Sequence, residues 1–187
     1  MMIALMELVD WVGLKLPSLR RARTAVAMAR SHLALAGCEV GKRVLVHGSL
    51  QLERRGRVVV GDRCVFVAGP FPTALHVERG GTLEVGQRCY FNYGAQLEVH
   101  DSVRLGERCL FGSYVRVTDA PGAPVVVGND VWVAHGAVIN PGVTIGDGAV
   151  IAAGSVVSAD VPAGMLAMGN PARLMSQQLS GSGGAHV

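Results

Sequence analysis

The residues best suited to chemistry in this chain of 187 residues are its six histidines. An imidazole exchanges a proton close to neutral pH, so each histidine is a candidate general base. Two of them, His100 and His135, lie in the central part of the chain and are the candidates for catalysis. The other four fall in a helical segment, on the surface of early repeats or in a polar tail, and suggest no chemistry: His32, His47, His76 and His186.

Composition narrows the class of protein that positions these histidines. Half of the residues are hydrophobic (50%) and 17% are charged, which excludes a disordered chain. A net charge of +3 is too small to indicate a nucleic-acid partner. No apolar run reaches the roughly 18 residues of a membrane span. The sequence also lacks a phosphate-binding glycine-lysine loop and a dinucleotide-binding glycine fingerprint.

A six-residue repeat predicts the fold. An aliphatic residue followed by glycine recurs from Val40-Gly41 to Ile145-Gly146, and in the last stretch the aliphatic residues are six apart: Val127, Val133, Ile139, Ile145, Ile151 and Val157. This period fits neither a helix nor an alternating strand. It fits a parallel β-helix, in which each hexad is a short strand plus a turn and three hexads form one coil. Residues 40–162 then make six to seven coils.

The cysteines support this register. Cys64, Cys89 and Cys109 each follow a repeat glycine by three residues, which predicts a stack of buried free thiols at one inner edge. A metal site or a disulfide is the alternative, but one ladder of successive coils gives poor tetrahedral geometry, and we expect no metal. Free thiols, and an N-terminus that does not resemble a signal peptide, indicate the cytoplasm.

The segments outside the coils complete the predicted organisation. Apolar residues at helical spacing predict two helices, over residues 3–16 and 18–36, that cap the first coil. A role at a membrane surface is the alternative for this pair. The predicted units are an N-terminal helical segment, the β-helix domain, a C-terminal motif segment and a disordered tail, over residues 1–39, 40–162, 163–175 and 176–187.

Residues 127–174 resemble the hexapeptide-repeat acyltransferases. The motifs are Val127-Gly-Asn-Asp-Val-Trp-Val, Ala153-Gly-Ser-Val-Val and Gly169-Asn-Pro-Ala-Arg, and the wider resemblance covers residues 40–174. The branch most similar comprises sugar, maltose and galactoside O-acetyltransferases and acetyltransferases of polysaccharide biosynthesis. The resemblance implies an all-β, left-handed parallel β-helix and a homotrimer with active sites between subunits. It also implies transfer from acetyl-CoA, with a histidine that deprotonates the acceptor.

The resemblance also assigns roles to positions in this sequence. Asn92 falls where the family holds the acceptor, and Trp132 lies where a tryptophan borders the acyl site. The backbone amide of His135 falls at the position that stabilises the oxyanion. Asp119 is a candidate to orient an imidazole across the cleft, and an exposed turn position is the other interpretation of it. The donor's pantetheine and phosphates are expected along Ala134, Ala152, Ala153, Gly154 and Arg173.

The catalytic histidine of the family is the main departure. It belongs in the loop after the strand ending at Thr118, and Gly122 stands at its place. His100 is expected about one coil, or roughly 5 Å, from that vacant position. We therefore predict His100 as the substitute general base and His135 as the second candidate. A threonine-lysine pair of the family is also replaced, by Ser158-Ala159.

The sequence thus predicts an acetyl-CoA-dependent O-acetyltransferase that modifies a hydroxyl, or an amine, of a sugar or polysaccharide precursor. Its alternative is a trimeric β-helix that has lost the chemistry and serves as a scaffold or binding module. Gly122 motivates this alternative, and the retained Asn92 and Trp132 oppose it.

Overall fold

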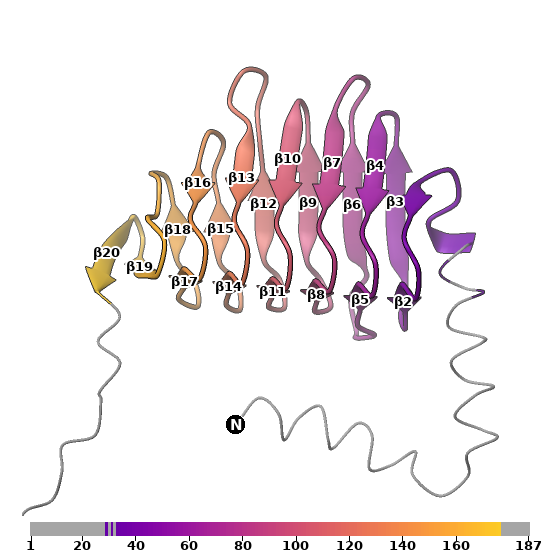
Figure 1. Cartoon of the computed structure of the whole chain (residues 1–187). Coiled ribbons are helices and arrows are strands. Elements are labelled where there is room, and N and C mark those ends of the chain that lie inside the picture. The colour runs from indigo at the N-terminus through magenta and orange to yellow at the C-terminus, as the bar shows by residue number, and fades with distance from the viewer. Residues whose placement is uncertain (1–28, 30, 32, 177–187) are drawn as a thin grey trace, which may run out of the picture.

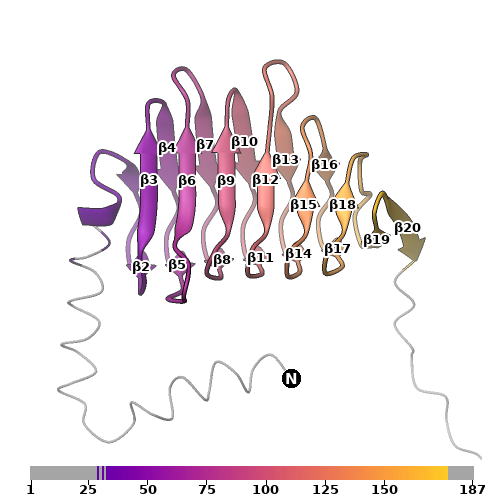
Figure 2. The same cartoon turned by 180° about the vertical axis from the view of Figure 1, so that it is seen from behind.

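Aliphatic residues six apart place one short strand on each of three faces, and the chain winds around them as a parallel β-helix (Figure 1, Figure 2). The computed structural model describes residues 29, 31 and 33–176. In Figure 1 each coil rises behind, crosses the top and descends in front while the chain advances to the left, which is a left-handed path. The left-handed parallel β-helix expected from the sequence is confirmed.

The strands form three sheets, here called faces A, B and C, with β20 alone antiparallel to its neighbour. Face A holds β1 (Glu39–Val40), β4 (Arg57–Val60), β7 (Thr82–Val85), β10 (Ser102–Leu105), β13 (Val125–Val127) and β16 (Thr144–Ile145). Face B holds β2 (Leu45–Val46), β5 (Val65–Phe66), β8 (Tyr90–Phe91), β11 (Leu110–Phe111), β14 (Trp132–Val133), β17 (Val150–Ile151), β19 (Met165–Gly169) and β20 (Ala172–Ser176). Face C holds β3 (Leu50–Arg54), β6 (Thr73–Val77), β9 (Gln96–Val99), β12 (Arg116–Thr118), β15 (Val138–Ile139) and β18 (Val156–Val157).

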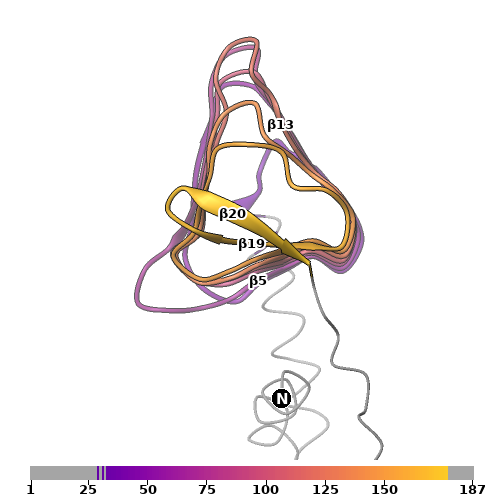
Figure 3. The same cartoon turned by 90° about the vertical axis from the view of Figure 1, so that its left-hand side faces the viewer.

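The core is a set of ladders inside this three-sided prism, which Figure 3 shows in projection along the coil axis. On face B the rings of Phe66, Phe91 and Phe111 stack with centroids 4.9 and 4.8 Å apart, and each ring is at most 2% exposed. The six-residue series identified in the sequence is buried throughout, from Val127 to Val157. The repeat therefore marks the residues that hold successive coils together.

The predicted stack of cysteines is confirmed at the inner edge between faces A and B. Cys64, Cys89 and Cys109 are free thiols that are at most 1% exposed. Each Sγ donates to a carbonyl oxygen of the next coil, at 3.1, 3.0 and 3.1 Å. The neighbouring thiol of Cys89 and burial raise the pKa of Cys109, which keeps that thiol protonated. Among residues 29, 31 and 33–176, no group of side chains is arranged to hold a metal ion.

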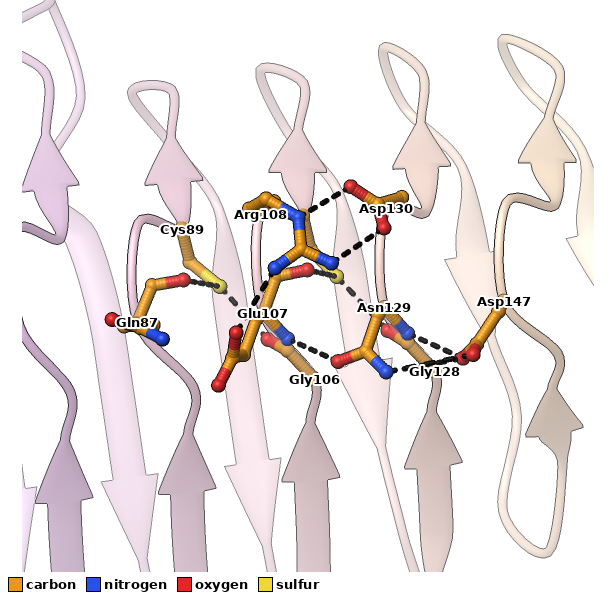
Figure 4. A network of polar contacts seen from close by, with 10 residues as sticks. Gln87, Cys89, Gly106, Glu107, Arg108, Gly128, Asn129, Asp130 and Asp147 are labelled. Atoms are coloured by element: carbon orange, nitrogen blue, oxygen red, sulfur yellow. Dashed lines mark hydrogen bonds and ion pairs between the residues drawn. The ribbon is translucent and has the colours of Figure 1, made fainter.

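Polar side chains secure the outside of the same corner (Figure 4). The Arg108 guanidinium donates to both carboxylate oxygens of Asp130 at 2.7 Å. Arg108 and Asp130 have φ angles of 56°, in the left-handed region that favours glycine. Asn129 and Asp147 each accept a backbone N–H from the preceding coil, at 2.9 and 2.7 Å. The tight corner thus has its backbone donors satisfied by side chains of the next coil.

Only the end of the predicted N-terminal helices falls among the described residues. Residues 29, 31, 33 and 34 are helical and residues 35 and 36 form a turn, so the predicted helix ends earlier than expected; the other residues of the two predicted helices lie outside the described part of the chain. The described end does cover the first coil, since Ser31 Oγ accepts the N–H of Val46 at 2.9 Å and Leu35 is 2% exposed. In the part of the chain that the structure describes, no helix combines the length and apolarity needed to cross a membrane.

Candidate active site

The corner between faces C and A carries His100, which follows β9, and Asp119, which follows β12 on the next coil. Thr118 pairs with Glu98, so Asp119 occupies the next, inward-facing position beside Val99. Its side chain has no exposed surface, and the interpretation of Asp119 as an exposed turn residue is therefore wrong. The reason is that the turn begins one residue later than the pattern suggests.

The Asp119 carboxylate organises the His100 corner. It accepts the backbone N–H groups of His100, Asp101 and Ser102 at 2.6, 2.8 and 2.6 Å. Its Oδ1 atom also lies 3.4 Å from Nδ1 of His100. After Asp119 the chain leaves the coil, and the carboxylate replaces the carbonyl acceptors that a continuing strand would offer. The carboxylate thus faces the Nδ1 side of the imidazole, which leaves Nε2 for a substrate.

The loop of residues 120–123 is built around Gly122, the position at which the resemblance predicts the family's histidine. Ala120 and Ala123 bridge this loop, and Gly122 has a φ of 72°. The N–H of Gly122 donates to Asp101 Oδ2 at 3.0 Å. A side chain at this φ is strained, so the turn disfavours histidine at this position. His100 and the Gly122 loop lie on adjacent coils, as expected.

A cavity of about 380 Å³ opens beside His100 on face C. It arises because Ala74 stands in an outward ladder between Gln51 and Gln96, where a longer side chain would fill the space. The cavity, called here the face C pocket, is lined by Ala74, His76, Gln96, Leu97, Glu98 and His100.

His76 is the pocket residue that sequence reasoning misplaces. The sequence predicts it on the surface of an early coil without a role in chemistry, but it pairs in register with Glu98, two residues from His100. The coil repeat contains the information that would place His76 near His100, but an insertion after Val77 obscures this register. Nε2 of His76 lies 2.9 Å from Glu78 and Nδ1 lies 3.0 Å from Glu53. Both ring nitrogens thus face carboxylates, which favours the protonated imidazole, so His76 is not placed to act as a free base.

This arrangement gives stability a dependence on pH. Hydrogen bonding to Glu78, with a further contribution from Glu53, raises the pKa of His76 above its usual 6.5. The folded state then holds the proton more tightly than the unfolded state, and the stabilisation is complete below pH 6.5 and lost as pH rises through the raised pKa. We predict that His76→Gln lowers the urea midpoint at pH 6 and leaves it nearly unchanged at pH 9. An equal shift at both pH values would contradict this prediction.

A second group of predicted residues lies at the corner between faces B and C. Trp132 points outward from β14 and is 45% exposed. The His135 ring packs edge-on against Tyr114 with centroids 5.5 Å apart, and Tyr114 packs likewise on Tyr93 at 5.5 Å. Asn92 opens the same corner and accepts the N–H of Tyr93 at 2.9 Å through its side chain. Tyr93, Tyr114 and His135 thus form a row of aromatic rings along this corner. The sequence analysis does not single out the two tyrosines.

The positions expected to hold the donor follow one another along this same corner. Ala134 donates its N–H to Ile151, and Ala152 donates to Ala167, each at 2.9 Å. The N–H of Gly154 donates to the carbonyl of His135 at 2.8 Å. Arg173 pairs with Met168 in the β19–β20 hairpin that closes the stack, and its side chain is exposed. Small side chains leave room for a slender ligand along this edge, and Arg173 offers a cation at its end. The row formed by Ala134, Ala152, Gly154 and Arg173 is called here the donor edge, because the resemblance predicts the donor there.

Within one chain the two groups occupy different corners of the triangle in Figure 3, with face C between them. The structure brings His100 together with Asp119 and the Gly122 loop. It brings Asn92, Trp132 and His135 together with the donor edge. It does not bring His100 and His135 together, so the two candidate bases are alternatives in separate places.

Comparison with known proteins supports the family that the six-residue repeat indicates. Residues 124–159 match the family model "Bacterial transferase hexapeptide (six repeats)", and residues 102–141 match "Hexapeptide repeat of succinyl-transferase". Nodulation protein L of Rhizobium leguminosarum bv. viciae is 40% identical over 139 residues, which cover 67% of this chain and 70% of that protein. The chain belongs to the hexapeptide-repeat transferases.

Solved structures of similar proteins match this hexapeptide-repeat transferase over most of its length. A point mutant of perosamine N-acetyltransferase from Caulobacter crescentus, in complex with CoA and GDP-perosamine, is 28% identical with a TM-score of 0.56, covering 84% of this chain and 65% of that chain. The polySia-specific acetyltransferase NeuO is 22% identical with a TM-score of 0.52, covering 80% of each chain. The second likeness bears on the fold alone.

Proposed function

We propose that this hexapeptide-repeat transferase moves an acetyl group from acetyl-CoA to a hydroxyl, or an amine, of a sugar or polysaccharide precursor. The observation that carries the proposal is His100, an imidazole that lines a pocket and lies beside a buried carboxylate. Family membership supports acyl transfer, and the similar perosamine enzyme was solved with CoA and a nucleotide sugar.

Acyl transfer requires one general base and one site that stabilises the oxyanion. Nε2 of His100 takes the proton of the acceptor hydroxyl as its oxygen attacks the thioester carbonyl carbon. The tetrahedral oxyanion collapses, the C–S bond breaks, and the CoA thiolate takes the proton back from His100. Asp119 stabilises the imidazolium that forms between these steps, at 3.4 Å from Nδ1. The backbone N–H of His135 is the proposed oxyanion donor.

We propose a homotrimer because the two groups of site residues lie at different corners of one chain. In the trimer, the His100 corner of one subunit meets the donor edge of the next, and three such sites form. The outward ladder of face B supports association because it is apolar on every coil: Leu45, Val65, Tyr90, Leu110, Trp132, Val150 and Leu166. The proposed location is the cytoplasm, where acetyl-CoA is available.

Thermal unfolding with acetyl-CoA tests the donor half of the proposal. At 100 times its Kd the ligand adds about 2.7 kcal/mol to the free energy of unfolding, which raises the melting temperature by several degrees. Arg173→Ala is expected to need a higher acetyl-CoA concentration for the same rise, and acetate serves as the control ligand. Release of CoA thiol with a panel of sugars then measures transfer.

The alternative is a trimeric scaffold without chemistry, and the glycine-built loop at residues 120–123 is the observation that favours it. An intact trimer whose melting temperature acetyl-CoA does not change would support the scaffold. A rise in melting temperature followed by transfer to a sugar would exclude it.

A further inference from the structure

We propose that the face C pocket is the acceptor subsite and that Glu98 selects uncharged or amine-bearing sugars against acidic ones. This inference rests on the proposed function and adds to it the class of acceptor. It assigns substrate contacts to residues outside the corner that holds His100 and Asp119.

The position of the pocket suits an acceptor. His100 forms part of its wall, and the donor edge lies at Ala134, Ala152 and Arg173 on later coils, so an acceptor entering from earlier coils would meet the base first. The pocket volume of about 380 Å³ is enough for a single sugar ring with its substituents. The void exists because one residue of the ladder, Ala74, is small.

The hydrogen-bonding groups left free in the pocket define the ligand. Arg116 Nε donates to Gln96 Oε1 at 3.3 Å, which leaves the amide NH₂ of Gln96 as a donor. Glu98 Oε2 lies 3.5 Å from Thr118 Oγ1, and no cation among the described residues forms an ion pair with Glu98. Its carboxylate and Nε2 of His100 are acceptors. A ligand that fits must donate hydrogen bonds, as a hydroxyl or an ammonium group does.

The charge around the pocket excludes acids. Glu53, Glu78 and Glu98 face it or lie beside it. The neighbouring basic side chains are engaged elsewhere: Arg55 with Glu78, His76 with Glu53 and Glu78, and Arg116 with Gln96. His76 is already bonded to two of these carboxylates, so it does not neutralise Glu98. A carboxylate on the acceptor would approach Glu98 without an intervening cation, and like charges close together repel strongly in a partly desolvated site.

Two variants test the pocket and the charge separately. Ala74→Gln continues the glutamine ladder of Gln51 and Gln96, so it fills the pocket with a residue that the sheet already accepts. We expect it to raise the KM for the acceptor about 10-fold or more and to leave the KM for acetyl-CoA unchanged. Val138→Gln is the matched control, because Val138 lies in the same ladder three coils beyond Ala74, outside the pocket.

The charge test uses N-acetylmuramic acid and its methyl ester, which differ in charge but hardly in size. The wild-type enzyme is expected to favour the ester by a factor on the order of 10 to 100 in kcat/KM. Glu98→Gln should bring this ratio close to one while the ester is still acetylated.

The outcomes separate this inference from the proposed function. Wild-type transfer to sugars that Ala74→Gln does not impair, or an ester preference that Glu98→Gln retains, would overturn the inference and leave the transferase standing. If the wild type transfers acetyl to no acceptor, binding of the methyl ester, measured by calorimetry, tests the pocket. Binding that Ala74→Gln abolishes and Val138→Gln retains supports the pocket alone, and unchanged binding, or none, overturns it.

Discussion

Replacing His100 by alanine lowers the turnover number for acetyl transfer by a factor of about 10² to 10⁴, the range for removal of a general base. The loss falls on kcat rather than on the KM for acetyl-CoA, because a general base acts on the acceptor's proton in the transition state and does not bind the donor. Initial rates of CoA release at saturating sugar measure the effect.

His135→Ala and His76→Ala are the controls for this experiment. Both ring nitrogens of His76 face carboxylates, so it is not placed to take the acceptor's proton, whereas His135, which packs on Tyr114, is the second candidate base. A loss under threefold for His100→Ala would remove His100 from the mechanism. A large loss for His135→Ala with a small one for His100→Ala would transfer the role to His135.

Replacing Asp119 by alanine destabilises the protein by about 3 kcal/mol and lowers turnover as well. The carboxylate accepts three backbone N–H groups on the adjacent coil, and hydrogen bonds to a charged group contribute about 1.5–3 kcal/mol each. Water recovers part of this loss because His100 and Asp101 are exposed. Urea unfolding gives the change in the free energy of unfolding.

Asp119→Asn separates the two roles of the carboxylate. The amide keeps the size of the side chain and one acceptor oxygen, so we expect it to cost less stability than alanine, and to lower kcat because the imidazolium loses its counter-charge. In a His100→Ala background the same substitution should change the residual rate very little. An equal effect of Asp119→Asn in both backgrounds would show that Asp119 does not act through His100.

The sequence predicts the fold because a β-helix repeats one short local pattern, the hexad, along the chain. The hexads from Val127 to Val157 contain no insertions, and every aliphatic position in that series is buried as expected. The cysteine stack follows from the same rule. Neither prediction requires knowledge of a contact beyond the neighbouring coil.

The candidate site is harder to predict because it lies where coils depart from the repeat. Asp119 falls at the last inward position before a loop, and a count of hexads does not show that its carboxylate takes over the hydrogen bonds of a corner. His76 and His100 line one pocket although they come from different coils, and the residues inserted between β6 and β7 obscure their relation. The positions at the donor edge follow from the resemblance and stay predictions.

The stacked cysteines can serve as built-in probes of local unfolding in this β-helix. Cys64, Cys89 and Cys109 sit on three successive coils, each sealed by the coil that follows it. An alkylating reagent reaches a given sulfur only when the local coils separate, so the labelling rate of each thiol measures the free energy of opening at that level. The native chain therefore carries three probes, without any engineered label, of whether the prism frays from one end or melts as a unit.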